Sequence, residues 1–153
     1  MKWQDLADDI YFRDGSLRDI YVHNTSKSDW LKWAALINEN YPVNFYNGKQ
    51  GVSTNRIDIE DVFGESNKST VFNAAFSLGD IQLNTHFFTE EEIEHDLDPA
   101  SIKSLEHHAR LMEYMITLAK VLGKNVDLTA ENMPDVVLLS TDDNSWQGSN
   151  LIF

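Results

Sequence analysis

Two adjoining segments of β-forming residues determine the fold class of this 153-residue chain. Residues 70–78 and 81–88 are rich in β-branched and aromatic side chains, and Gly79-Asp80 between them is a short hairpin connection. In the second segment apolar and polar residues alternate, which is typical of a strand with one buried face. The pair therefore predicts an antiparallel hairpin. Its two faces carry Ile81, Leu83, Thr85 and Phe87 on one side and Gln82, Asn84, His86 and Phe88 on the other.

Two other segments have the spacing of amphipathic helices. The first has Ser26 or Ser28 available as its cap and ends at Pro42. The second is predicted to begin at Asp98-Pro99, with Asp as the N-cap and Pro at the first helical position, and to end at Gly123. Its apolar surface is broad enough to contact a sheet and a further element, or a second subunit. A second apolar stripe on this helix contains Leu111, Met115, Leu118 and Leu122.

The N-terminal part of the chain predicts another hairpin. The apolar run 10–12 and the β-rich segment 17–23 flank the turn signal Asp14-Gly15-Ser16. Farther along, Thr89-Glu90-Glu91-Glu92 has the pattern of a capping box, which predicts one or two helical turns.

The remaining elements complete an α+β pattern. Short strands are expected at 43–46, 125–128 and 134–140, and residues 48–68 are irregular. The resulting order, β-β-α-β-β-β-α-β, predicts a single α+β domain over residues 1–153, with a mainly antiparallel sheet and two principal helices.

Charge is the strongest global clue to function. Twenty-five acidic and twelve basic residues leave a net charge of −13. Such a field repels nucleic-acid phosphate and anionic membranes, and it steers a basic partner toward the protein. Residues 89–106 contain seven acids and one base, which is nearly half of the excess. We therefore expect an electrostatic binding site in this segment.

Several chemistries find no support in the sequence. The chain has no cysteine, so disulfides, zinc-thiolate sites and thiol nucleophiles are excluded. Glu92 and His95 have the Glu-x-x-His spacing of di-iron bundles, but those sites need a second copy and two more glutamates. No phosphate-binding loop, nucleophile elbow or dinucleotide fingerprint is present. We expect a soluble, cytoplasmic protein without metal, cofactor or catalytic residues.

Three stretches of the sequence resemble a family of small, acidic bacterial proteins, some of them encoded near toxin genes. These stretches are Ser16 to Val22 (SLRDIYV), Asp29-Trp30, and His86 to Pro99 (HFFTEEEIEHDLDP). The resemblance implies an immunity protein, which binds and neutralises a cognate toxin that is frequently a basic nuclease. It transfers no individual binding residue.

Together these observations predict a non-enzymatic immunity or inhibitor protein, monomeric or homodimeric, that binds a basic toxin through an acidic surface. Charge pairs would set specificity and association rate, and aromatic side chains would hold the complex. The residues predicted to contact the partner are Glu90, Glu91, Glu92, Glu94, Asp96 and Asp98, with apolar anchorage from Phe88, His86 or the exposed part of Trp30.

Two alternatives remain open from the sequence. One is an acidic, dimeric adaptor resembling a secretion chaperone, which would use the second stripe of the 99–122 helix and cover Leu111, Met115 and Leu118 in its interface. The other is a small enzyme or ligand-binding protein with a pocket between sheet and helices, at whose mouth His86 or His23 would lie.

Overall fold

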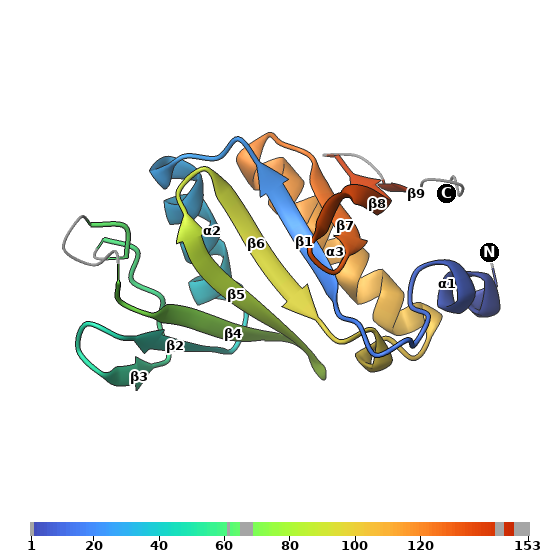
Figure 1. Ribbon diagram of the computed structural model, residues 1–153, viewed down its shortest axis with the longest axis horizontal. Helices are drawn as coiled ribbons and strands as arrows, with labels where there is room; N and C mark the ends of the chain where they lie inside the picture. Colours follow the sequence, from blue (N-terminus) through green and yellow to red (C-terminus); the bar gives the residue numbers. More distant parts are fainter. Residues whose placement is uncertain (1, 61, 65–68, 143–145, 149–153) are drawn as a thin grey trace.

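The computed structural model describes residues 2–60, 62–64, 69–142 and 146–148, the last three by their backbone alone. In this part of the chain nine strands form one sheet, in the order β3-β2-β4-β5-β6-β1-β7-β8-β9, and each described pair is antiparallel. Helices α2 (Lys27–Asn40) and α3 (Leu105–Leu122) lie against one face of the sheet, and α1 (Trp3–Asp9) lies near one end of α3 (Figure 1). The strands are β1 (Arg18–His23), β2 (Val43–Asn47), β3 (Val52–Thr54), β4 (Phe72–Leu78), β5 (Ile81–Thr89), β6 (Glu92–Leu97), β7 (Val126–Ala130), β8 (Met133–Thr141) and β9 (Trp146–Gly148).

The predicted α+β class is therefore confirmed, and so are its main elements. Strands β4 and β5 pair as the expected hairpin, and Gly79 in their turn has a φ of +65°, which suits glycine. Helix α2 begins after Ser26, whose backbone N–H donates to the Asp29 carboxylate at 3.0 Å in a capping box. Helix α3 ends at Gly123 in the left-handed conformation, as predicted.

The predicted N-terminal hairpin is wrong, because the first element is helix α1 and residues 10–12 form no strand. The buried guanidinium of Arg18 explains how the backbone of this segment is hydrogen-bonded without a paired strand. It donates to the carbonyl oxygens of Ile10 at 2.8 Å and Phe12 at 2.5 Å, and its Cζ lies 4.2 Å from the centre of the Phe12 ring. These backbone groups are thus satisfied by a side chain instead of a partner strand.

Two predicted helix starts are also wrong. Residues 89–92 form the turn between β5 and β6, where the Glu91 N–H donates to the Thr89 hydroxyl at 3.3 Å. Asp98 caps only a short 3₁₀ turn, Pro99–Ser101, and α3 starts after Ser104, whose hydroxyl accepts from His107 N–H. At residues 89–92 the local capping signal was outweighed by strand β6, which buries alternate residues. At Asp98 the capping signal was valid, but it starts only the short 3₁₀ turn, and α3 uses the separate cap of Ser104.

Both long helices are joined to the sheet by a buried chain of hydrogen bonds. The Trp33 indole N–H on α2 donates to the Tyr114 hydroxyl on α3 at 3.1 Å, and this hydroxyl lies 2.8 Å from Nε2 of His95 on β6. His95 Nδ1 in turn lies 2.9 Å from the Thr85 hydroxyl on β5. Burial lowers the pKa of His95 to about 3, so the ring is neutral and has one nitrogen to donate and one to accept. The chain therefore satisfies polar groups that would otherwise be costly to bury.

The second stripe of α3 belongs to this same core. Leu111, Met115 and Leu118 have no exposed surface in the single chain, so they are not available as the interface that a dimeric adaptor was expected to use. Within the described residues, no helix combines the length and apolar character needed to cross a membrane.

Tyr114→Phe tests the buried hydrogen-bond chain. The variant keeps the ring but leaves the Trp33 N–H and His95 Nε2 without their shared partner, so we expect the free energy of unfolding to fall by about 2 kcal/mol. Urea denaturation measures it. Tyr41→Phe is the matched control, because the Tyr41 ring packs against Tyr114 but its hydroxyl bonds no described residue. Equal effects of the two changes would contradict this role for Tyr114.

Candidate functional site

The central part of the acidic segment predicted from the sequence forms strand β6. Its burial alternates, with Ile93, His95 and Leu97 directed into the core. The intervening residues Glu92, Glu94 and Asp96 therefore lie on the opposite side of the sheet, which neither α2 nor α3 covers (Figure 1). We call this side, over strands β5, β6, β1 and β7, the helix-free face.

The neighbouring strands add further polar side chains to the helix-free face. In the antiparallel register His23, Tyr21 and Asp19 of β1 lie opposite Glu92, Glu94 and Asp96 in turn. Directly opposed residues share a face of the sheet. By the same rule Asp127 of β7 lies on this face opposite Tyr21, and His86 of β5 lies on it opposite Glu94.

Carboxylates predominate on this face, although Asp19 among them is buried. The paired positions of β5, β6, β1 and β7 on it include five carboxylates and no Lys or Arg. In contrast, α2 and α3 each carry two acidic and two basic residues, so each helix is neutral overall.

Tyr21 holds two of these carboxylates together. Its hydroxyl lies 3.1 Å from an oxygen of Asp19 and 3.1 Å from one of Glu94, and the Asn132 N–H donates to Asp19 at 2.7 Å. Burial raises the pKa of both Asp19 and Glu94. Repulsion from Asp96 and Glu131 adds to the rise at Asp19, and repulsion from Asp19 adds to the rise at Glu94. Because the hydroxyl has a single proton to donate, it compensates only one of the two charges at a time. The pair is therefore held at an electrostatic cost that a nearby cation would reduce.

A second interaction fixes His86. Its Nε2 lies 2.5 Å from Asp96 Oδ2, and this hydrogen bond raises the pKa of His86 in spite of partial burial. Burial would raise the pKa of Asp96, but the hydrogen bonds from His86 and Asn84 and the charge of His86 together lower it. On its other side the His86 ring stacks on Phe88, with ring centres 5.3 Å apart and planes inclined by 7°. Phe88 is 73% exposed.

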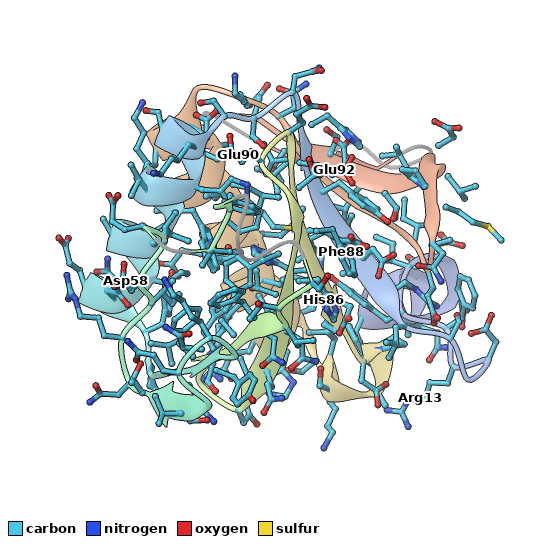
Figure 2. The ribbon with its side chains drawn as sticks, turned by 60° about the vertical axis from the view of Figure 1, so that its left-hand side comes forward. Arg13, Asp58, His86, Phe88, Glu90 and Glu92 are labelled. Atoms are coloured by element: carbon cyan, nitrogen blue, oxygen red, sulfur yellow. The ribbon has the colours of Figure 1, made fainter. Side chains whose placement is uncertain are left out.

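The other residues predicted to contact a partner lie outside strand β6, and one of them is buried. Glu90 and Glu91 lie in the β5–β6 turn, and Asp98 is exposed just beyond the other end of β6. Figure 2 shows Glu90 near Glu92 at the turn end of the strand. Trp30 corrects an expectation, since it has no exposed surface. Its indole N–H lies 3.2 Å from the carbonyl oxygens of Thr89 and Glu90, so it supports the turn from inside and provides no surface anchor.

The sequence analysis missed Asp19 and Tyr21, which lie beside β6, and Asp127 on the next strand, and it considered His23 only for the mouth of a pocket. His23 Nδ1 lies 2.9 Å from Glu92 Oε2, across 69 residues of chain. The alternation in segment 17–23 could have shown that Asp19, Tyr21 and His23 share a face. Nothing in the sequence could have shown which strand they pair with.

The described cavities lie away from the two histidines proposed for a pocket mouth. The largest, about 560 Å³, is lined by α2 and by residues between Phe45 and Glu60, and neither His23 nor His86 contacts it or either of the two smaller ones. The Asn38 amide in its wall is already engaged by both backbone polar groups of Ile57. In the described part of the chain, no group of three His, Asp or Glu side chains is arranged to hold a metal ion.

The fold and the face thus define an α+β protein with one antiparallel sheet and an acidic, helix-free surface. One chain of a crystal structure, that of the toxic C-terminal tip of CdiA from Pseudomonas aeruginosa in complex with immune protein, is similar to this protein with a TM-score of 0.56 and 13% identity. The match covers 89% of this chain and 99% of that chain, and at this identity it shows a shared fold. No family model and no curated protein sequence matches.

Asp96→Asn tests the His86–Asp96 pair through its pH dependence. Because the native pKa of His86 is raised above its ordinary value, protonated His86 stabilises the fold below about pH 6.5, and this contribution is lost as the pH rises through the native pKa. Without the carboxylate we expect the pKa of His86 to fall toward its ordinary value. The decrease in the free energy of unfolding that deprotonation of His86 causes as the pH rises should then disappear. NMR titration of the His86 ring and urea unfolding between about pH 6 and 8.5 measure both. An unchanged pKa of His86 in the variant would contradict the assignment.

Proposed function

We propose that this chain is a non-enzymatic immunity-type protein that binds and neutralises a basic bacterial toxin through its helix-free face. The observation that carries the proposal is the predominance of carboxylates on that face. Glu92, Glu94 and Asp96 extend along one strand, and Glu90 and Glu91 continue the row into the adjoining turn. A sheet face with this charge and no helix over it suits a large, positively charged protein surface.

The electrostatics of the face favour binding to cations. The raised pKa values of Asp19 and Glu94 mean that their negative charges are disfavoured in the free protein. An ammonium or guanidinium group brought near them would stabilise the charged forms. The wider field of the chain, with its net charge of −13, would raise the rate of encounter with a basic protein. The proposed site therefore contributes to both the affinity and the association rate.

The fold comparison supports the toxin–immunity setting. The similar chain belongs to a complex of a toxin tip with its immune protein. Within a complex of this kind, a strongly acidic chain suits the inhibitor better than it suits a toxin that acts on nucleic acid, because phosphate binding relies on basic groups. The resemblance of residues 16–22 and 86–99 to small acidic immunity-type proteins agrees with this assignment.

The same charge argument suggests the class of toxin. A nuclease presents basic side chains to the phosphates of its substrate, and an acidic surface can occupy those side chains in place of the substrate. We therefore propose a nuclease-type toxin, a cytoplasmic site of action, and inhibition by occlusion without any catalytic step by this chain.

Neutralising three glutamates tests the proposed surface. In the triple variant Glu90→Gln, Glu91→Gln and Glu92→Gln, we expect the association rate with the toxin to fall about tenfold at low salt, with a weaker dependence on salt, because steering acts through these charges. Stopped-flow kinetics with the cognate toxin measure the rate. Rescue of bacterial growth on co-expression provides an independent readout.

The control is a second triple variant, Glu39→Gln, Glu106→Gln and Glu113→Gln, which removes the same charge from exposed positions on α2 and α3. It should leave association close to that of the unaltered protein. Equal losses in both variants would show that only net charge matters, and the helix-free face would not be the binding surface. A failure of the unaltered chain to rescue growth would overturn the immunity function itself.

A further inference from the structure

Phe88 is an exposed aromatic side chain in an otherwise polar and acidic surrounding. It is the most exposed large apolar residue of the described chain, at 73%. Its neighbour along the strand, Phe87, packs inward against Trp30, with ring centres 5.1 Å apart. Phe87 therefore points into the core and Phe88 lies on the helix-free face. Packing in the core accounts for an aromatic residue at position 87 but not at position 88.

The ring of Phe88 is held in a defined orientation. It stacks nearly parallel on the ring of His86, which is fixed in turn by its hydrogen bond to Asp96. One face of the Phe88 ring is thus occupied, and the opposite face is directed toward solvent. A rigid ring loses little conformational entropy when a partner packs against it.

Carboxylates flank this ring on the adjacent strand. The pairing of β5 with β6 matches His86 with Glu94 and Thr89 with Glu92, and the register shifts between these two pairs. Phe88 therefore lies between the levels of Glu94 and Glu92, on the same side of the sheet (Figure 2). Adjacent strands are about 4.8 Å apart, so the backbones of both glutamates lie one strand away from Phe88, and their carboxylates bond Tyr21 and His23 of β1.

We propose that Phe88, stacked on His86 and flanked by Glu92 and Glu94, is a recognition site for an arginine side chain of the partner. This inference rests on the proposed function and specifies the chemistry of its binding surface. A guanidinium is planar and weakly hydrated, so it stacks on an aromatic ring while its N–H groups bond a carboxylate in pairs. The lysine ammonium is compact and strongly hydrated, and it satisfies only the charge. An arginine would thus use the ring and the carboxylates together.

Two peptides that differ only in carrying arginine or lysine at the same positions test the proposal. NMR titration of the intact chain, followed at the Phe88 and His86 rings, gives the affinity for each. We expect the arginine peptide to bind about threefold more tightly, as expected for an exposed cation–π contact. In Phe88→Leu, which keeps an apolar side chain without a ring, this preference should disappear. Val71→Ala, at another exposed apolar residue, should retain it.

Each contrary outcome separates this inference from the proposed function. Equal affinity of the two peptides, or an equal loss for both in Phe88→Leu, would show a nonspecific contact and overturn the arginine site. The immunity function would stand in that case if the triple glutamine variant still slowed association with the toxin. The absence of any shift at Phe88 with either peptide would also overturn the arginine site. Failure of growth rescue, in contrast, would overturn the immunity function whichever peptide binds.

Discussion

The hydrogen-bond chain from Trp33 through Tyr114 and His95 to Thr85 determines how the rest of the molecule is arranged. It connects α2 and α3 to β6 and β5 in the centre of the core, and a buried neutral histidine is tolerated only while it has these partners. Because side chains alternate along a strand, an inward His95 requires both of its neighbours to face outward. A slip of one residue would bury carboxylates and expose Ile93 and Leu97, so the core interaction also specifies the acidic surface.

The helix-free face departs from what stability alone would favour. Asp19 and Glu94 share one tyrosine hydroxyl, no Lys or Arg lies beside them on the paired strands, and Phe88 is left exposed. The two helices show the opposite arrangement, with balanced charges on the surface and apolar residues inside. Such departures from local rules are expected where a surface is used for binding, since a partner supplies the missing charge and covers the exposed ring. The physical basis of the proposed function is this contrast between the two sides of one sheet.

Elements with a strong local signal were predictable from the sequence. The β4–β5 hairpin follows from alternation around Gly79-Asp80, and the ends of α2 and α3 follow from Ser26 and Gly123. Predictions failed where two signals competed. The segment Glu92–Leu97 reads as polar and acidic, yet it forms a central strand because Ile93, His95 and Leu97 fill the core between β5 and β1. The N-terminal segment failed for a related reason, since Arg18 supplies the hydrogen bonds that a strand would have supplied.

Composition and periodicity are local properties, and they were sufficient to predict the α+β class, the acidity of the chain and the concentration of that acidity between Thr89 and Glu106. Which acidic side chains share a surface depended on the pairing of strands that are distant in the chain. Strand β1 enters the sheet between β6 and β7, and this pairing brings Asp19, Tyr21 and His23 beside carboxylates about 70 residues away in the chain. The same packing buried Trp30 and exposed Phe88, two aromatic residues that the sequence could not tell apart. Their difference arises from the side of the sheet on which each lies, and that is set by contacts distant in sequence.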